Sequence, residues 1–485
     1  MLRRHWPFAL VLAAGAVLRL AAEAAYRPAL FYSDSWGYLS MAHGTGIVSF
    51  APLRPSGYPL ILKVLHWLTL TTVVQHLAGL ATATLVYATC SALGVRRWLA
   101  TVAGALVALD AWAIALEQYI LAESFFALAL MLAVWATVAG AVRFELSDTG
   151  ESGRWSSGQR LRPRGSAAIA LGFAGLCLAA AVLMRPVGLF AVPAWVIWMI
   201  WVRPGIRPVL AGLACLAVPL LVYSLAHSHV TGTFGLTQAN GWFLYGRVGS
   251  IASCNGIDVA RDARKLCNRT AEADHENQSW FIFNRRSPAR QAFGGISADS
   301  SKQSRSDRIL GHFARQVIAE RPGAYLKLAG TDLLKYFRPG PHALHREDDT
   351  VEFPRTARIR FDDPTIRHRL FPGLRTHASA PAGALRTYAG VFHTSRVLVA
   401  LIVLAGLVAL VLGFTTRDPR LPALFLTLGV GVGLLLGAAL GAGFALRYLV
   451  PAVPALAAAG ALAAESLASA ARRWQSQRAQ PMAAT

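Results

Sequence analysis

Residues 421–441, LPALFLTLGVGVGLLLGAALG, decide the class of this protein because they contain no charged side chain. A helix of about 20 apolar residues is long enough to cross the hydrocarbon core of a bilayer. The segment therefore predicts a membrane-spanning helix, and the chain on either side of it contains further stretches of the same kind. The predicted spans, roughly ten in all, are 8–25, 71–93, 98–115, 121–142, 166–184, 187–202, 208–227, 394–414, 421–441 and 445–470.

The composition agrees with a membrane protein. Of the 485 residues, 55% are hydrophobic and only 15% are charged, below the quarter or so that is usual in soluble domains. The net charge of +22 would suggest nucleic acid in a soluble protein, but no basic helix or aromatic RNA motif is present. Basic residues in a membrane protein mark cytoplasmic loops and contact anionic lipids, so we expect membrane lipids and no nucleic acid as partners.

The positions of the arginines predict the orientation. Clusters of arginine lie between or beside the spans, at residues 3–4, 96–97, 143–164, 203–207, 417–420 and 472–478. All of them fall on the cytoplasmic side if the chain has ten spans and both termini are cytoplasmic. We therefore expect an all-α polytopic protein of the cell (plasma) membrane, multi-pass, with one large loop outside the cytoplasm.

This map predicts four regions. They are an N-terminal transmembrane module of seven spans (1–227, with a first outer loop at 26–70), an extracytoplasmic loop region of mixed structure (228–393), three C-terminal spans (394–470) and a cytoplasmic tail (471–485).

Local patterns predict some structure in the outer loops. Residues 56–70 are apolar on one side, which is typical of a helix lying in the membrane interface. Residues 307–337 have an amphipathic helical pattern that is interrupted at Pro322. We expect a mobile stretch or lid at 285–306 and irregular structure at 338–390.

Two of the five cysteines, Cys254 and Cys267, lie in the predicted outer loop. An oxidising compartment favours a disulfide between them, which would stabilise the fold by about 3 kcal/mol on a chain-entropy argument. The alternative is a pair of free thiols.

Charged residues at the outer ends of spans are the candidates for chemistry, because a charge near hydrocarbon is costly to keep. Asp34 follows the first span and could accept a proton from a hydroxyl, although a solvated loop acid or a helix N-cap would look the same. Acids and arginines at one depth can also simply pair with each other. The other candidates at this level are Arg54, Asp110, Glu117, Glu123, Arg185 and Arg447.

Motifs of soluble catalysis are missing from the sequence. It contains no GxxxxGK[ST], no convincing dinucleotide fingerprint, no HExxH and no GxSxG. This argues against a nucleotide-hydrolysing transporter but leaves a secondary transporter open.

Five motifs in a fixed order resemble a known family: DSWGYL after the first span, RPSGYPLIL, LAES, LMRPVGL and RYLVPAVPAL near the end. The pattern looks like that of membrane glycosyltransferases of the C-type fold (GT-C). Within them it is similar to the bacterial protein O-mannosyltransferase and aminoarabinose transferase group, which is family 39-like. The resemblance covers residues 1–230 and 394–460.

The resemblance implies an enzyme, a polyprenyl-phosphate-dependent glycosyltransferase with its site on the extracytoplasmic side. Its partners would be a polyprenyl-phosphate sugar donor and a protein, lipid or glycan acceptor. Asp34 matches the catalytic acid of the first loop, and Glu123 matches a second acidic position whose role is less defined. Arg447 matches a residue that holds the carrier phosphate, and the further substrate-binding candidates are Arg54, Arg185, Tyr38 and Glu117.

The sequence differs from the family pattern at a position that bears on metal binding. Many relatives have two adjacent acids in the first loop, whereas here Ser35 follows Asp34. We therefore expect no obligatory metal and no cofactor.

The expected reaction is a single displacement at the anomeric carbon, which inverts its configuration. Two alternatives remain. Another lipid-linked glycan polymerase or ligase would use a similar site, and a secondary transporter would show inverted repeats, of which none is convincing.

Overall fold

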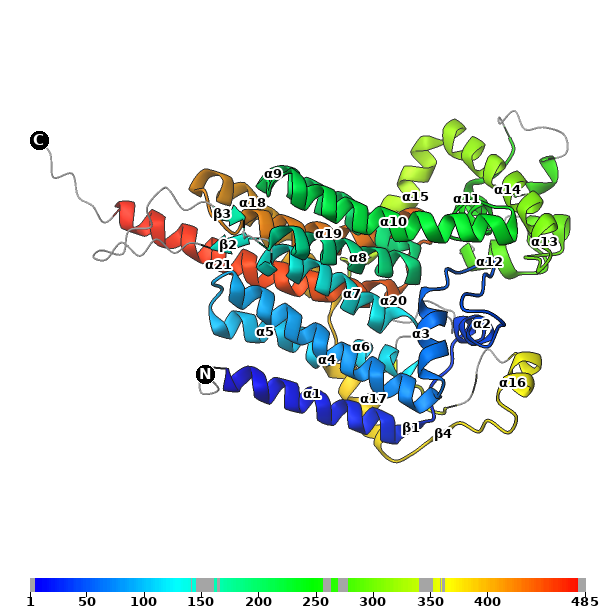
Figure 1. Ribbon diagram of the computed structural model, residues 1–485, viewed down its shortest axis with the longest axis horizontal. Helices are drawn as coiled ribbons and strands as arrows, with labels where there is room; N and C mark the ends of the chain where they lie inside the picture. The colour runs from blue at the N-terminus through cyan, green and yellow to red at the C-terminus, as the bar shows by residue number, and fades with distance from the viewer. Residues whose placement is uncertain are drawn as a thin grey trace, which may run out of the picture.

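The computed structural model describes residues 5–140, 142–144, 161–163, 166–255, 263–268, 278–339, 352–357, 359 and 363–478. The described chain is mostly helical, with a bundle of long helices and a group of shorter helices beyond one end of it (Figure 1). The helices of the bundle are α1 (Trp6–Ala25), α4 (Leu68–Ala92), α5 (Arg97–Ala108), α6 (Ala111–Gln118), α7 (Glu123–Trp135), α8 (Ala167–Met184), α9 (Val192–Val202), α10 (Ile206–Thr231), α18 (Arg396–Thr416), α19 (Leu421–Gly441), α20 (Leu446–Leu449) and α21 (Val453–Arg478).

The remaining helices lie outside the bundle or along its edge. They are α2 (Ser33–Ala42), α3 (Gly57–Leu65), α11 (Asn240–Val248), α12 (Gln278–Phe283), α13 (Pro288–Phe293), α14 (Ser300–Glu320), α15 (Pro322–Lys335), α16 (Pro364–Leu370) and α17 (Pro381–Val391). Two small antiparallel pairs complete the fold, β1 (Tyr26–Arg27) with β4 (His377–Ala378) and β2 (Val142–Phe144) with β3 (Leu161–Pro163).

Within the described residues, seven helices are long and apolar enough to cross a membrane: α1, α4, α8, α10, α18, α19 and the helix that runs from α20 into α21. The pair α5 and α6, bent by 40°, would make an eighth span. Two shorter apolar helices cover Glu123–Val138 and Pro186–Val202. Each predicted span coincides with one of these segments, so a multi-pass membrane protein is supported, while the count of ten remains a prediction.

The bend between α5 and α6 has a local cause in Asp110. One oxygen of its carboxylate caps α6 by accepting the backbone N–H groups of Trp112 (2.8 Å) and Ala113 (3.2 Å). The other oxygen accepts the N–H of Thr394 (3.0 Å), just before α18. An N-cap acid satisfies amide groups that have no partner within the helix, so the third predicted span is broken at this residue.

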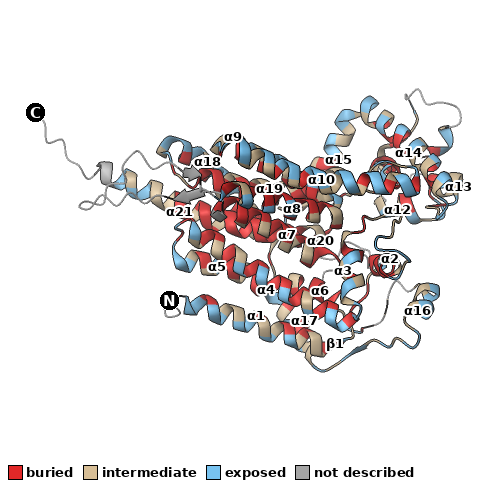
Figure 2. Cartoon of the chain, in the orientation of Figure 1, coloured by how far each residue is buried: buried red, intermediate tan, exposed pale blue. Residues whose placement is uncertain are grey.

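Burial separates the centre of the bundle from its rim (Figure 2). The helix from α20 into α21 is the most enclosed, with 83% of its apolar window buried, whereas only 17% of the window in α10 is buried. The exposed residues on α1, α10 and α18 are largely apolar. A soluble protein rarely exposes so much apolar surface, and lipid would cover it here.

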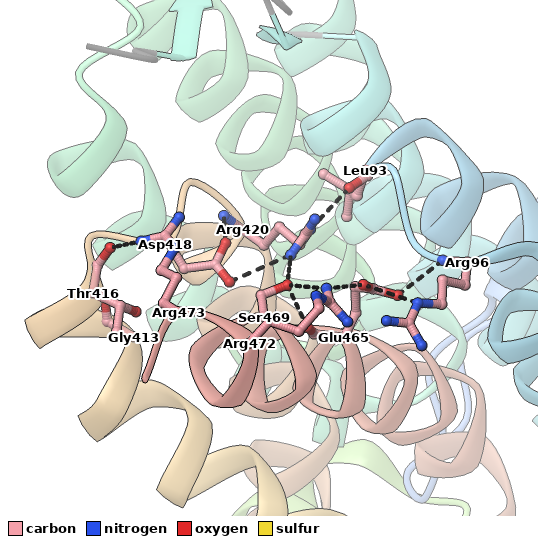
Figure 3. Close-up of polar contacts among 10 residues, drawn as sticks. All are labelled: Leu93, Arg96, Gly413, Thr416, Asp418, Arg420, Glu465, Ser469, Arg472 and Arg473. Atoms are coloured by element: carbon pink, nitrogen blue, oxygen red, sulfur yellow. Dashed lines mark hydrogen bonds and ion pairs between the residues drawn. The ribbon is translucent and has the colours of Figure 1, made fainter. Parts of the chain in front are cut away.

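Arginines from several predicted cytoplasmic clusters lie at one end of the bundle (Figure 3). Glu465 on α21 is buried there and accepts the backbone N–H of Arg96 (3.1 Å), and Arg472 pairs with it (3.4 Å). Arg420 donates from Nε to the carbonyl of Leu93 (3.3 Å). The described chain begins and ends at this same end (Figure 1).

The helices α11 to α15, residues 240–335, are here called the outer unit. They have a hydrophobic core of their own, built around the buried rings of Trp242, Tyr245, Phe281 and Phe313. The predicted break at Pro322 is confirmed, because α14 ends at Glu320 and α15 begins with this proline.

Helices lie in two stretches of the loop 228–393 for which the sequence predicts none. The stretch 285–306 contains α13 and the start of α14, which Ser287 and Asp299 cap, and its role as a mobile stretch or lid stays a prediction. Irregular structure throughout 338–390 is wrong for its described part, which contains α16 and α17, while residues 340–351, 358 and 360–362 lie outside the described residues. The interfacial helix expected at 56–70 is present as the shorter α3, and the span α4 already begins at Leu68.

Candidate active site

Asp34 is the second residue of α2, and its carboxylate lies between two arginines. Its Oδ2 is 2.9 Å from Nη1 of Arg447, and its Oδ1 pairs with Nη2 of Arg54. Burial by itself would raise the pKa of this carboxyl. The attraction of Arg54, and then of Arg447, outweighs burial and holds the pKa of Asp34 well below its usual range. Asp34 is therefore an anion at neutral pH.

A second ion pair lies beside the first. Arg185, between α8 and the 3₁₀ turn Pro186–Ala191, pairs with Glu123 at the start of α7. Glu123 is buried. The guanidinium of Arg185 also lies 5.2 Å from the ring centre of Tyr448.

Tyrosine rings lie against the other two arginines. The guanidinium of Arg54 is 4.9 Å from the ring centre of Tyr38, and that of Arg447 is 4.9 Å from Tyr32 and 5.3 Å from Tyr448. Such contacts stabilise a cation by about 0.5–2 kcal/mol, more where water is excluded. The rings therefore help to keep the arginines in this partly buried place.

We call Asp34, Arg54, Glu123, Arg185 and Arg447 the Asp34 cluster. It has three guanidinium groups and two carboxylates, and so an excess of one positive charge. The acids and arginines pair with one another, which is the alternative to a catalytic role that the sequence left open. The excess charge nevertheless suits an anion, and guanidinium groups fit phosphate oxygens well.

A close backbone contact brings two of the arginines together. A Cβ atom on Gly57 would lie only 2.6 Å from the carbonyl oxygen of Leu183, so glycine allows the start of α3 to pack directly on the end of α8. Arg54 lies just before this contact and Arg185 just after it. The two motifs RPSGYP and MRPVG are therefore joined in space through this glycine.

Ser35 anchors α2 to the bundle. Its buried Oγ accepts the N–H of Tyr32 (2.9 Å) and donates to the carbonyl of Ile120 (2.9 Å). The position where many relatives have a second acid thus has a structural hydroxyl here. Among the described residues, no group of three or more His, Cys, Asp or Glu side chains is arranged to hold a metal ion.

Glu117 is not part of the Asp34 cluster. It lies inside the bundle, where its carboxylate is 2.8 Å from both Nε and Nη2 of Arg19 and 2.8 Å from Nδ1 of His76. Arg19 was not among the sequence candidates, although a charged residue inside a predicted span was a signal for it. The contacts of Tyr32 and Tyr448 with the arginines were not predicted either, although both tyrosines lie close to candidate residues in the sequence.

A cavity of about 570 Å³ lies near the cluster. Tyr119 forms part of its wall, and the ring of Tyr119 is 6.5 Å from the ring of Tyr32, the tyrosine that contacts Arg447. Its other lining residues include Trp112, Glu352, Phe353, Arg355, Arg386 and His393. Aromatic walls with a few charged groups are typical of small-molecule sites.

The predicted disulfide is confirmed. Cys254 and Cys267 are bonded, and their Cα atoms are 5.5 Å apart. Cys267 packs into the core of the outer unit. The bridge therefore holds Cys254 and the segment after α11 against that core.

Residues 72–228 match the family described as "Dolichyl-phosphate-mannose-protein mannosyltransferase", which confirms the resemblance for that part of the chain. The matched part contains Glu117, Glu123 and Arg185 and ends before the outer unit. A comparison with curated protein sequences finds no match.

The solved structures that resemble the chain at low identity include two lipid-phosphate complexes. One is the archaeal oligosaccharyltransferase AglB from Archaeoglobus fulgidus in complex with an inhibitory peptide and a dolichol-phosphate, with a TM-score of 0.43, 11% identity, and coverage of 100% of this chain and 53% of that one. The chain thus spans about half the length of this relative. The other is ArnT from Cupriavidus metallidurans bound to undecaprenyl phosphate, with a TM-score of 0.31, 13% identity, and coverage of 89% and 77%.

Proposed function

We propose that this protein transfers a sugar from a polyprenyl-phosphate carrier to an acceptor hydroxyl, at the end of the bundle that bears the outer unit. The observation that supports this most is the carboxylate of Asp34 between Arg54 and Arg447. A base for the acceptor and cations for the leaving phosphate would then lie within one cluster. We place this end outside the cytoplasm, following the distribution of arginines.

The carrier phosphate would bind to the arginines. Arg447 and Arg185 both contact the ring of Tyr448, so their guanidinium groups lie near each other. The Asp34 cluster also has one more positive than negative charge. As the bond between the anomeric carbon and the phosphate oxygen breaks, its electron pair stays on the phosphate. The arginines would stabilise the charge that develops there, and such preorganised stabilisation is usually the largest contribution to catalysis.

Asp34 would take the proton of the acceptor hydroxyl while that oxygen forms the new bond to the anomeric carbon. A carboxylate paired with two arginines is a weak base, because they favour its charged form. Phosphate that binds Arg447 would compete with Asp34 for this cation and so raise the proton affinity of Asp34. In this proposal, binding of the donor phosphate makes Asp34 a stronger base. The single displacement then inverts the configuration at the anomeric carbon of the sugar.

The acceptor would approach through the cavity lined by Tyr119, Arg355 and Arg386. Tyr119 in this wall lies 6.5 Å, between ring centres, from Tyr32, whose ring is 4.9 Å from the guanidinium of Arg447. The two arginines favour an acceptor with a negative charge. We expect Arg386→Ala to raise KM for the acceptor several-fold with little change in KM for the donor, whereas equal changes in both constants would contradict this placement.

The test is a transfer assay with the purified full-length protein and a panel of synthetic polyprenyl-phosphate sugars. Release of polyprenyl phosphate and gain of sugar by added acceptors are measured together. We expect activity with at least one monophosphate donor, and an increase of tenfold or more in KM for that donor in Arg447→Met. Arg97→Met, exposed at the other end of the bundle, serves as the control and should behave as wild type.

The same assay addresses the alternatives. Activity only with a diphosphate-linked oligosaccharide would indicate a glycan polymerase or ligase. Binding of a lipid-linked sugar without any transfer, together with its movement across a vesicle membrane, would indicate a transporter. A product with retained configuration at the anomeric carbon would contradict the single displacement.

A further inference from the structure

The turn that joins α19 to α20, residues 440–445, lies directly before Arg447. It reverses the chain with Gly443 in the left-handed region, at a φ of +88°. The amide groups of Ala442 and Gly443 both donate to the carbonyl of Ala438 at 2.8 Å, which ends α19. Because α20 has only four residues, the position of this turn decides where Arg447 lies.

Side chains of the outer unit bind the backbone of this turn. Gln278 on α12 donates from Nε2 to the carbonyl of Gly441 (2.7 Å), and the hydroxyl of Tyr325 on α15 donates to the carbonyl of Leu440 (3.0 Å). These bonds cross from one hydrophobic core to the other. They hold the first half of the turn against the outer unit.

Tyr336, the residue after α15, binds the second half of the turn. Its hydroxyl accepts the N–H of Ala445 and donates to the carbonyl of the same residue, both at 3.3 Å. Its ring is fully buried and packs on Phe444, with 4.7 Å between ring centres. Ala445 is two residues before Arg447, so Tyr336 fixes the backbone from which that guanidinium extends.

A buried ion pair covers the middle of the turn. Arg247 on α11 pairs with Asp332 on α15 at 2.7 Å. A Cβ atom on Gly443 would lie 3.3 Å from Nη1 of Arg247 and 3.4 Å from Oδ2 of Asp332. The two helices of the outer unit are therefore joined directly over the glycine of the turn.

We infer that Tyr336, which directly follows α15 and packs in the core of the bundle, is a positioning residue through which the outer unit holds Arg447 against Asp34. This inference rests on the proposed role of Arg447 in binding the carrier phosphate. Tyr336 acts through the backbone of Ala445, to which its hydroxyl is bonded. The outer unit thus sets the geometry of the phosphate site in addition to covering it.

The test compares Tyr336→Phe with Tyr245→Phe in the full-length protein in lipid nanodiscs. Tyr245 is an apt control because its buried hydroxyl also donates to a backbone carbonyl, that of Leu266 (2.9 Å), but within the outer unit and away from the turn. Binding of undecaprenyl phosphate is measured for each variant, with thermal unfolding as a check on folding. We expect about a fivefold loss of affinity in Tyr336→Phe, because both long hydrogen bonds of the hydroxyl to Ala445 are lost, and no loss in the control.

A double-mutant cycle separates positioning from a general structural role. In the background of Arg447→Met, Tyr336→Phe should have no further effect on binding, because the two act through one group. Gln278→Ala, on the other half of the turn, should weaken binding in the same direction. Equal losses in Tyr336→Phe and Tyr245→Phe, or an unchanged affinity in Tyr336→Phe, would overturn the inference.

The result also separates this inference from the proposed function. If Arg447→Met leaves the affinity for undecaprenyl phosphate unchanged, the proposed role of Arg447 fails. If Arg447→Met weakens binding while Tyr336→Phe and Gln278→Ala do not, only the positioning role of the outer unit fails.

Discussion

At the scale of single residues, the charge of Asp34 depends on its two arginine partners. Coulombic attraction by Arg54 lowers the pKa of Asp34, and Arg447 lowers it by attraction and by a hydrogen bond. A carboxylate must be ionised to accept a proton. The low pKa therefore keeps Asp34 in its active form well into the acidic range.

Replacing Arg54 by glutamine should move the acidic limb of the pH profile upward. Loss of the cation raises the pKa of Asp34, so on acidification the carboxylate becomes protonated, and inactive as a base, at a higher pH. We expect a shift of about one pH unit or more in kcat/KM for the donor, the constant that reports groups of the free enzyme. Arg54→Lys keeps the charge and should shift the limb less, and identical limbs in wild type and Arg54→Gln would contradict the account.

Glu117 and Glu123 should differ in what they support. Glu117→Gln leaves the buried guanidinium of Arg19 without its counter-ion, which is expected to cost about 3–5 kcal/mol of stability. Glu123→Gln should instead change KM or kcat for the donor, because Arg185 is its partner. Thermal unfolding and kinetics of both variants check this, and a Glu117→Gln protein with normal stability but lost activity would reverse the two roles.

The sequence could identify the charged residues, but it could not tell which of them belong to the Asp34 cluster and which lie inside the bundle. Asp34, Arg185 and Arg447 were found because a charge near hydrocarbon is costly to keep and because their motifs resemble those of the family. Glu117 and Glu123 lie on one short segment, and only the resemblance separated Glu123 from Glu117. Only the end of α6 between them turns Glu117 into the bundle and leaves Glu123 facing Arg185.

At the scale of elements, the disulfide should matter to the outer unit and much less to the bundle. The bridge between Cys254 and Cys267 closes a short loop, and Cys267 packs in the core of the outer unit. Replacing both cysteines by serine should destabilise this unit by about 3 kcal/mol. Hydrogen exchange should therefore become faster in α11 and α14 and remain unchanged in α19, whereas unchanged exchange in the outer unit would contradict the prediction.

The helices α13 and α14 show where pattern-based prediction of elements failed. The stretch 285–306 is rich in serine and arginine and has two adjacent glycines, Gly294 and Gly295, which is typical of loops. Serine and aspartate are also the preferred N-cap residues, and Ser287 and Asp299 have that role here. Composition alone does not distinguish a polar loop from two capped helices that pack on a neighbouring core.

At the scale of the whole molecule, each predicted span coincides with an apolar helix or helix pair, because the thickness of a bilayer sets the length of an apolar helix. The sequence did not predict how the helices pack. The helix from α20 into α21 became the centre of the bundle, and α10 became part of its rim, although both are apolar. Packing depends on small residues and partners far apart in the chain, which hydropathy does not contain.

The predicted orientation can be tested by cysteine labelling. Ile47, before α3, and Thr415, at the end of α18, are both exposed and lie at opposite ends of the bundle. A single cysteine at position 47 should react with a membrane-impermeant maleimide in intact cells, and one at position 415 only after permeabilisation. The free cysteines Cys90, Cys177 and Cys215 are first replaced by alanine. The opposite pattern of labelling would show that the orientation is the reverse of the predicted one.

The most direct test of the central claim is sugar transfer by Asp34→Asn, compared with wild type on the same polyprenyl-phosphate donor. Asparagine keeps the size of the side chain but cannot accept the proton. We expect the rate of transfer to fall by about 10²–10⁴-fold, while undecaprenyl phosphate still binds because Arg447 has lost a competing carboxylate. Transfer at the wild-type rate in Asp34→Asn would contradict the account.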